Sequence, residues 1–144
     1  MPLSPYFAGT KVRWMLDNVT ELREDLQDPR RRHQVCFGTV DSWLLYQLTG
    51  KVSSTPGAAN VQGMFATDVT NASRWLFMNL KTTNWDKKLV DTICAPHEVP
   101  VSAFPEILPS SHLYGYCSKD CGISSLKDEL IPLTSILGDQ QVRR

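Results

Sequence analysis

Residues 34–50 read QVCFGTVDSWLLYQLTG, and this stretch decides the fold class of the chain. Its opening, residues 34–37, is short and apolar, which is typical of a buried strand. Apolar side chains then recur at helical spacing, at Val40, Trp43, Leu44 and Leu48. Thr39 is a favourable residue before the first turn of a helix, and Gly50 is favourable after the last turn. A strand followed directly by a helix predicts an α/β fold.

The regions on either side of this stretch carry further helix and strand patterns. A first helix, capped by Thr10, is predicted from apolar residues that share one face: Val12, Met15, Leu16 and Val19. Another helix, capped by Asn84, is predicted to carry Trp85, Leu89 and Ile93. Short apolar runs predict strands at residues 65–69, 77–80 and 113–116, and a weaker pattern indicates a helix at residues 124–130.

Three segments are expected to lie at the surface. Residues 21–32 alternate in charge, which predicts a solvated helix end and loop. Residues 51–63 are rich in small and polar side chains and predict a flexible loop. Repeated prolines predict an extended surface connection across residues 97–111. The run Arg30 to Arg32 has the charge to bind an anion, but a solvated surface run is the favoured interpretation.

The end of the chain carries the strongest candidate for chemistry. Residues 131–137 are apolar and β-branched, which predicts a buried strand that delivers Asp139 to its carboxyl end. In open α/β sheets that end faces the ligand crevice. A carboxylate there can orient and deprotonate a substrate hydroxyl. The alternative is a turn in which Asp139 caps the next helix, and these residues alone leave both possibilities open.

Near the other end, Tyr6 precedes the first predicted helix. Its ring offers a rigid apolar wall with a hydroxyl group, which suits the binding of a small polyol. The alternative is a core aromatic residue beside a helix cap. A zinc half-site at Cys117 and Cys121, with His112 nearby, is disfavoured because the spacing is unusual and no second pair follows. No metal site is therefore expected.

Composition narrows the class of protein. The chain has 144 residues, of which 42% are hydrophobic, enough for one domain with a single core. Fifteen basic residues balance fifteen acidic ones, so neither nucleic acid nor an anionic membrane is an expected partner. No apolar run is long enough for a membrane span. The four scattered cysteines and the absence of a signal-like opening predict a reducing, cytoplasmic location.

Taken in order, five motifs resemble those of the glycerol kinases, and they span nearly the whole chain. The motifs are residues 5–14, 37–44, 67–74, 109–115 and 138–141. Glycerol kinases belong to a sugar-kinase family with the ribonuclease-H-like, actin-like ATPase fold. The resemblance therefore implies an α/β domain, with a mixed sheet and flanking helices, and a substrate cleft between two domains.

The same resemblance implies a reaction and residues to perform it. The family transfers the γ-phosphoryl group of ATP, with Mg²⁺, to glycerol. Asp139 aligns with the catalytic base, which also binds substrate, while Tyr6 and Gln140 align with residues that contact the glycerol hydroxyls. Phosphoryl transfer needs mainly positioning and charge stabilisation, so these side chains suffice on the acceptor side. Four other motif residues are interpreted as structural caps, turns and paired charges: Asp41, Asp68, Asn71 and Arg74.

The chain also departs from the family pattern. It is expected to hold the latter part of the N-terminal domain in residues 1–137 and the start of the domain boundary in residues 138–144. The family's ATP-phosphate turn would precede it and the second domain would follow it, and no other phosphate loop appears, so the residues that bind the nucleotide are unknown. The glycine-rich loop that binds a sugar bisphosphate in some bacterial members has no counterpart in residues 117–130, so that regulation is expected to be absent.

These departures predict that the chain alone phosphorylates nothing. One alternative is a non-catalytic homologue that acts as an interaction or regulatory partner, by pairing with a full-length kinase or as a homo-oligomer. Another alternative is a kinase for a pentulose or another polyol. The motif at residues 67–74 favours glycerol over these acceptors.

Overall fold

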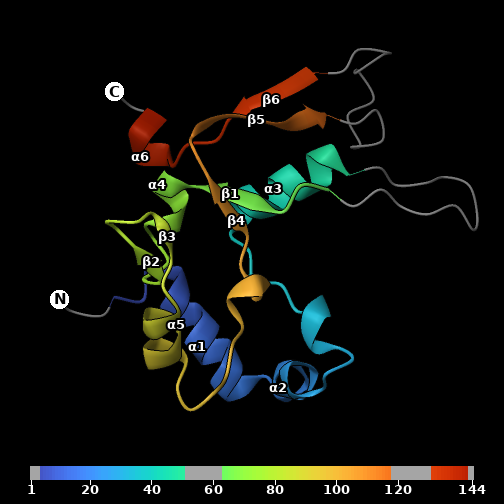
Figure 1. The fold of residues 1–144 in the computed structure, drawn as a ribbon, viewed down its shortest axis with the longest axis vertical. Helices are drawn as coiled ribbons and strands as arrows, with labels where there is room; N and C mark the ends of the chain where they lie inside the picture. The colour runs from blue at the N-terminus through green and yellow to red at the C-terminus, as the bar shows by residue number, and fades with distance from the viewer. Residues whose placement is uncertain (1–3, 51–62, 118–130, 143–144) are drawn as a thin grey trace, which may run out of the picture.

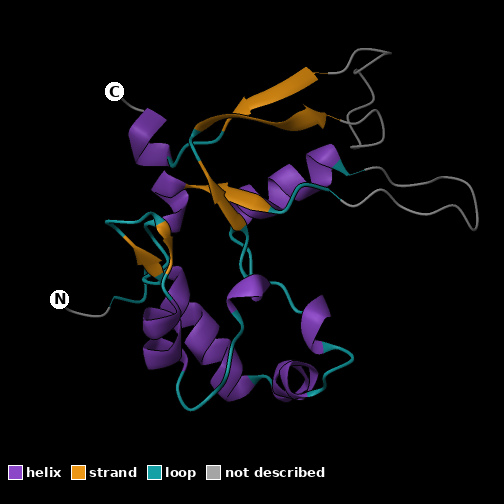
Figure 2. Ribbon diagram, viewed as in Figure 1, coloured by secondary structure: helices purple, strands orange, loops and turns teal. Residues whose placement is uncertain are grey.

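A computed structural model describes residues 4–50, 63–117 and 131–142, which form an α/β structure with three two-stranded sheets (Figures 1 and 2). The helices α1 (Ala8–Asn18), α2 (Thr20–Gln27) and α5 (Lys87–Cys94) gather at one end of the molecule. The helix α3 (Val40–Thr49) lies in the middle, beside the parallel pair β1 (Ala66–Asp68) and β4 (Glu106–Leu108). The antiparallel pair β5 (Ser111–Cys117) and β6 (Ile131–Ser135) lies at the opposite end.

Shorter elements complete the chain. The four-residue helix α4 (Val69–Ala72) follows β1 directly, and α6 (Asp139–Val142) follows β6 after a short loop. The strands β2 (Met78–Asn79) and β3 (Asn84–Trp85) form a small antiparallel hairpin. Two turns of 3₁₀-helix, η1 (Arg32–Gln34) and η2 (Val101–Ala103), link the larger elements.

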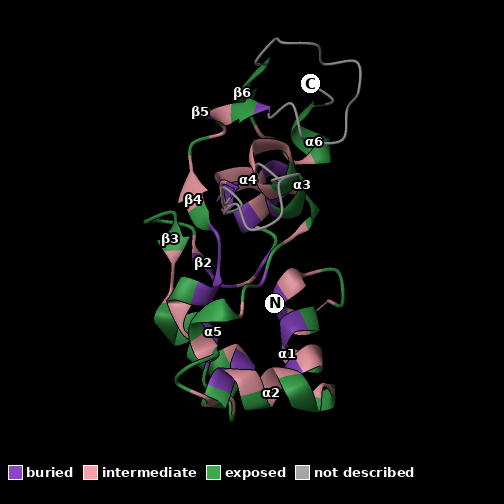
Figure 3. Ribbon diagram, turned by 90° about the vertical axis from the view of Figure 1, so that its right-hand side faces the viewer, coloured by how far each residue is buried: buried purple, intermediate pink, exposed green. Residues whose placement is uncertain are grey.

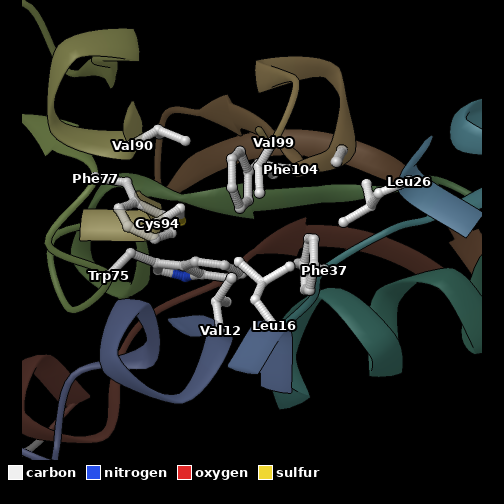
Figure 4. Packing of buried hydrophobic residues seen from close by; sticks show 11 residues of the cluster. Val12, Leu16, Leu26, Phe37, Trp75, Phe77, Val90, Cys94, Val99 and Phe104 are labelled. Atoms are coloured by element: carbon white, nitrogen blue, oxygen red, sulfur yellow. The ribbon is translucent and has the colours of Figure 1, made fainter. Parts of the chain in front are cut away.

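The main core lies between α1, α5 and the segments that run past them (Figure 4). Its centre is aromatic: the Phe104 ring lies 5.1 Å from Phe77 and 5.6 Å from Trp75, centroid to centroid. The Trp85 indole packs at the edge of this group and donates a hydrogen bond to the Pro105 carbonyl at 2.7 Å. Packing these four rings together stabilises the fold because it removes a large apolar area from water.

A second, smaller cluster joins α3 to the sheets. It consists of Leu45, Ala66 and Tyr114, with partly buried neighbours on β4 and β6. The Tyr114 hydroxyl donates to the Pro109 carbonyl at 2.8 Å, so its polar end is satisfied inside the cluster. Figure 3 shows buried positions running from α1 and α5 through the loop below β4 to the region of α3 and α4. The two clusters therefore connect the two ends of the molecule.

The helix predicted from residues 40–50 is confirmed, but its buried face is not the predicted one. The helix runs from Val40 to Thr49, between Thr39 and Gly50 as expected. However, Val40 is 73% exposed and Trp43 is 59% exposed, whereas the buried residues are Ser42 and Leu45. The helix is apolar on more than one side, so spacing alone did not determine which side faces the core.

The strand predicted at residues 34–37 is wrong. Gln34 ends η1, and the residues that follow are extended but form no strand ladder. Phe37 is instead held by its buried side chain and by one backbone hydrogen bond, which its amide donates to the Ala103 carbonyl at 2.8 Å. The apolar character of this run is thus explained by packing and not by sheet pairing.

Two segments predicted at the surface contribute to the core. Residues 20–27 form α2, in which Leu26 is 6% exposed. Residues 97–111 contain η2 and β4, and Val99, Ala103 and Phe104 are buried there. In both cases a few apolar residues among charges or prolines decided the burial.

The remaining element predictions need smaller corrections. The predicted strands at residues 65–69, 77–80 and 113–116 correspond to β1, β2 and β5 with shifted ends. The cap of α5 is Asp86, whose side chain accepts from the Lys88 amide, and not Asn84. The predicted helix at residues 124–130 and nearly all of the loop at residues 51–63 lie outside the described residues.

The last strand forms where predicted but is exposed instead of buried. Ile131 is 44% exposed, and only Leu133 among the five residues of β6 is partly covered. Among the described residues, the strand pairs only with β5, with an irregular register between Ser111 and Gly115. Gly115 has a φ of +144°, and a Cβ there would lie 3.0 Å from the Thr49 side chain, so this bend requires glycine.

Candidate functional site

The loop between β6 and α6 brings Asp139 to a fixed place on the surface. Two backbone amides tie this loop down. The Ile136 amide donates to the Ser110 carbonyl at 3.1 Å, and the Gly138 amide donates to the Thr70 hydroxyl at 2.8 Å. Asp139 is the first residue of α6 and is exposed. Figure 1 shows α6 lying next to α4, which carries Thr70.

Asp68 is the buried group on which these ties depend. Its side chain is fully buried and accepts hydrogen bonds from three side chains and two backbone amides. The side-chain donors are the Thr70 hydroxyl at 2.7 Å, the Asn71 amide at 2.7 Å and the Ser110 hydroxyl at 2.5 Å. Burial acts to raise the pKa of Asp68, but the hydrogen bonds from Ser110 and Thr70 outweigh it and hold the pKa below its usual value.

Thr70 and Ser110 transmit this arrangement to the catalytic candidate. The Thr70 hydroxyl donates to Asp68 and accepts from the Gly138 amide, so one oxygen links the buried carboxylate to the loop. Ser110 donates its hydroxyl to Asp68 and offers its carbonyl to Ile136. A buried, fully hydrogen-bonded network of this kind restrains the groups attached to it. The backbone on both sides of residue 137 is therefore held by the same carboxylate.

Tyr6 lies just before α1, and the first residues of α1 are hydrogen-bonded to the segment that follows α4. The Ala8 amide donates to the Arg74 carbonyl at 3.0 Å, and the Gly9 amide donates to the Trp75 carbonyl at 2.9 Å. A Cβ on Gly9 would collide with that carbonyl, so glycine permits the close approach. Tyr6 itself is 62% exposed, and its ring meets Phe7 edge to face.

We call residues 68–75 the anchor segment, because both candidate regions attach to it. Its start holds Gly138 through Thr70, and its end holds the first residues of α1. In Figure 1 the segment before α1 and α6 lie on the same side of the molecule, with α4 and the β2–β3 hairpin between them. The structure thus places Tyr6, Asp139 and Gln140 on one scaffold. Among the described residues, no hydrogen bond joins Tyr6 to the other two.

Asp139 lies within the first turn of α6 and not at the position before it. The residue before α6 is Gly138, whose carbonyl accepts from the Gln141 amide at 3.0 Å. The Asp139 carboxylate accepts from the next amide, that of Gln140, at 2.9 Å. Its exposed carboxylate still has acceptor capacity, because each carboxylate oxygen accepts more than one hydrogen bond. The side chain is therefore available to a hydroxyl group of a ligand.

Most of the motif residues that were interpreted as structural have that role in the structure. Asp68 caps α4 by accepting from the backbone amides of Thr70 and Asn71. Asp41 accepts from the Thr67 hydroxyl at 2.6 Å, which fastens α3 to β1. The expected paired charges are wrong, because the partners of both carboxylates are hydroxyl and amide groups. Arg74 is exposed and forms no ion pair among the described residues.

Sequence reasoning missed Thr70 and Ser110 as supporting residues. The pattern of an aspartate followed by threonine and asparagine does signal a helix cap, and it identifies the local part of the network. The bond from Ser110 spans 42 residues and the bond from Gly138 spans 68. Nothing in a single sequence marks such distant contacts.

Two sizeable cavities lie away from the candidate residues. One, of about 670 Å³, is lined by Trp43, Tyr46 and Phe65 among others. The other, of about 320 Å³, lies beside α1 and α2. The three candidate residues line neither of these cavities, and each of them is exposed. The described residues also contain no cluster of three potential metal ligands, and none of their helices is long and apolar enough to cross a membrane.

The residues around Asp139 do not fit ATP phosphates or Mg²⁺. The sequence has no glycine-rich phosphate loop, and Asp139 is a single carboxylate without a second acidic partner in hydrogen-bond or ion-pair contact among the described residues. Magnesium is usually held by more than one oxygen ligand, with phosphates of the substrate. What this surface offers is an exposed carboxylate and a neighbouring amide side chain, both of which can bind hydroxyl groups of a ligand.

The fold of the described residues agrees with a comparison that places the chain in one protein family. The model of the FGGY family of carbohydrate kinases, N-terminal domain, matches residues 1–143, and the chain belongs to this family. It is 43% identical over 143 residues to glycerol kinase 1 of Streptomyces avermitilis, covering 98% of this chain and 24% of that protein. It is 45% identical over 141 residues to a glycerol kinase of Clavibacter michiganensis, covering the same shares.

A solved structure agrees with these relatives. The crystal structure of Plasmodium falciparum glycerol kinase with ADP matches with a TM-score of 0.70 and 30% identity, over 96% of this chain and 23% of that one. The resemblance to glycerol kinases and the expected fold class are therefore confirmed. The chain spans about a quarter of the length of the relatives that it matches.

Proposed function

We propose that this chain forms the acceptor side of an ATP-dependent glycerol kinase, which converts glycerol to glycerol 3-phosphate. The observation that carries the proposal is the tie from buried Asp68 through Thr70 to Gly138. It fixes the backbone just before an exposed carboxylate and a neighbouring amide side chain. The relatives named glycerol kinase, matched over nearly the whole chain, support glycerol as the acceptor.

Each candidate residue has a role in this proposal. The Asp139 carboxylate accepts the proton of a glycerol hydroxyl as that oxygen attacks the γ-phosphorus of ATP. Gln140 offers both a donor and an acceptor to the neighbouring hydroxyls. Tyr6 provides an apolar ring beside the carbon chain and a hydroxyl at its edge. Fixing these groups before the reaction lowers the entropic cost of bringing acceptor and donor into line.

The donor side is proposed from the family alone. ATP is the phosphoryl donor, with Mg²⁺ bound to its phosphates, and residues outside the described part of the chain would hold them. We further propose a cytoplasmic location, because that is where ATP is available to a metabolic kinase. Residues 1–137 would belong to the N-terminal domain, and residues 138–144 would begin the boundary with a second domain.

A segment exchange tests the function directly. The 143 residues matched in Streptomyces avermitilis glycerol kinase 1 would be replaced by the corresponding residues of this chain. The folded chimera should phosphorylate glycerol in a coupled assay with magnesium-ATP, and should prefer glycerol to pentuloses and other polyols. Preference for another acceptor would identify a related polyol or pentulose kinase instead.

A second candidate function rests on the exposed face of α3. Val40, Trp43 and Leu44 are large apolar residues that are 73%, 59% and 46% exposed. Contiguous apolar surface of this kind is common at protein interfaces. A non-catalytic role as a partner of a full-length kinase or of a second copy would leave the chimera inactive. The isolated chain would then form a complex in size-exclusion chromatography, and Trp43→Ser would dissolve it.

A further inference from the structure

A cavity of about 320 Å³ lies between α1, α2, η1 and the loop after α5, away from the acceptor surface. Leu16 and Leu26, which are 0% and 6% exposed, form its apolar floor. Its polar lining comes from Arg23, Gln27, Arg32, His97 and Glu98. In Figure 1 this end of α1 and α2 lies opposite the end that carries α6. The cavity is therefore a different place from the surface around Asp139.

The three arginines at residues 30–32 have different surroundings in the structure. Arg31 is neutralised by ion pairs with Asp25 at 2.6 Å and Asp28 at 3.1 Å. Arg30 is exposed and uses only its backbone amide, which donates to Asp28. Arg32 is half-buried and lines the cavity, and its side chain has no hydrogen-bond or ion-pair partner among the described residues. Arg32 thus brings an unneutralised charge to the cavity.

Arg23 adds a second guanidinium whose position is fixed. It donates to the carbonyls of Leu16 and Asp17, both at 2.9 Å, and to the Thr20 hydroxyl at 3.0 Å. None of these partners is a carboxylate, and Arg23 forms no ion pair among the residues that the structure describes. His97 also faces the cavity, but its Nε2 is paired with Asp17 at 2.9 Å. Two arginines are therefore the positive groups available to a ligand.

Glu98 and Gln27 give the cavity a second kind of polar group. Glu98 is exposed and forms no ion pair among the described residues, although it shares the cavity with Arg32. A carboxylate accepts hydrogen bonds from hydroxyl groups and repels a second anionic group. Gln27 supplies both a donor and an acceptor. The lining therefore favours a ligand with one anionic group and several hydroxyls.

We propose that this cavity binds a small phosphate ester that carries free hydroxyl groups. Arg23 and Arg32 hold the phosphate, because the planar guanidinium matches two phosphate oxygens at once. Glu98 and Gln27 accept the hydroxyls, and the leucine floor lowers the local dielectric and strengthens the charge interactions. The volume is at the lower end of the range for small-molecule sites, which suits a ligand of this size. The proposal does not depend on the function proposed for Asp139.

Titration of the complete 144-residue chain with glycerol 2-phosphate tests the proposal, by calorimetry and by amide chemical shifts. We expect saturable binding, with shifts at residues 23–32 and 96–98, and weaker binding as salt is raised. Arg32→Gln should weaken binding about tenfold or more, which is a loss of about 1.4 kcal/mol. Arg30→Gln is the matched control, because it removes an equal charge two residues away and should leave binding unchanged.

Titrations with ethyl phosphate, inorganic phosphate and glycerol test two points separately: that the cavity binds phosphate, and that the ligand is an ester with free hydroxyl groups. Glycerol 2-phosphate should bind more tightly than ethyl phosphate, and Glu98→Ala should remove that preference. Glycerol alone should not bind at this cavity.

Three outcomes would overturn the phosphate site: equal binding by the Arg32→Gln and Arg30→Gln variants, shifts confined to other residues, or the absence of saturable binding. Equal affinity for ethyl phosphate, inorganic phosphate and glycerol 2-phosphate would overturn the assignment of an ester with hydroxyls. Because the Arg32 side chain has no partner among the described residues, Arg32→Gln should fold normally, which its thermal unfolding checks.

Discussion

The backbone amide of Gly138 donates a hydrogen bond to the hydroxyl of Thr70, which lies 68 residues earlier in the chain. That hydroxyl in turn donates to the buried carboxylate of Asp68. One side chain therefore connects the start of the anchor segment to the residue that precedes the proposed base. The position of Asp139 thus depends on a short polar contact between distant parts of the sequence and not on burial of its own strand.

Replacing Thr70 by valine tests this link. The variant keeps the shape of the side chain but leaves the Gly138 amide without its acceptor and removes one donor from Asp68. We expect the free energy of unfolding in urea to fall by about 1–3 kcal/mol. Exchange of the Gly138 amide with solvent should also accelerate. Thr92→Val, which removes an exposed hydroxyl that donates to the Lys88 carbonyl, is the control and should change stability by less than about 0.5 kcal/mol. Equal effects of the two substitutions would contradict the link.

Acid should weaken the fold partly through Asp68. The folded pKa of this carboxyl lies below its ordinary value of 3.8, so the folded state binds its proton less readily than the unfolded state does. The stability from its hydrogen bonds is present above the unfolded pKa and is lost as pH falls from about 4 through the folded pKa. Unfolding free energies at pH 6 and at about pH 3 should differ more for the wild-type chain than for Asp68→Asn. An identical pH dependence in both proteins would show that Asp68 is not the responsible group.

The close approach of α1 to the end of the anchor segment predicts a strong effect of Gly9→Ala. A Cβ at this position collides with the Trp75 carbonyl and lies 2.9 Å from the Phe77 ring. The backbone must move, and we expect a loss of about 1–3 kcal/mol in thermal or urea unfolding. Gly38→Ala is the matched control, because its nearest neighbours would lie at 3.4 Å and 3.5 Å, which is ordinary contact. A larger loss for Gly38→Ala than for Gly9→Ala would count against the described packing.

The cysteines should differ in reactivity. Burial raises the pKa of Cys94 to about 11, and the residue is fully buried in the main core, whereas Cys36 is exposed. The thiolate is the reactive form, so at pH 8 Cys94 should react with iodoacetamide far more slowly than Cys36. Mass spectrometry of peptides after timed labelling gives both rates, and urea should bring the two rates together. Fast labelling of Cys94 in the folded chain would mean that the core around it opens readily.

The sequence predicted where a helix begins and ends better than it predicted which side of the helix is buried. Thr39 and Gly50 flank α3 as predicted, because helix ends depend on adjacent residues, but the Thr39 hydroxyl makes no capping hydrogen bond among the described residues. The side of α3 that is buried was wrong, since the helix is apolar around much of its circumference and Ser42, not Trp43, is buried. Tertiary contacts alone decide between such faces.

The candidate site also has a part that was predictable from local sequence and a part that was not. The position of Asp139 just after a strand was predictable, because strand and turn patterns are local. Its support was not, because Ser110 and Thr70 act over long separations and their hydroxyls carry no distinctive pattern. The resemblance of the motifs supplied the residues, and the structure supplied the network that holds them.

The most direct test of the central claim is the turnover of the chimera with Asp139 replaced by asparagine. Asparagine keeps the size of the side chain and cannot accept the hydroxyl proton as a carboxylate does. We predict that kcat with glycerol and magnesium-ATP falls about a hundredfold or more. Asp91→Asn, which removes an exposed carboxylate paired with Lys87, should leave kcat unchanged. Turnover of the Asp139→Asn chimera equal to that of the Asp91→Asn control would contradict the assignment of Asp139 as the base.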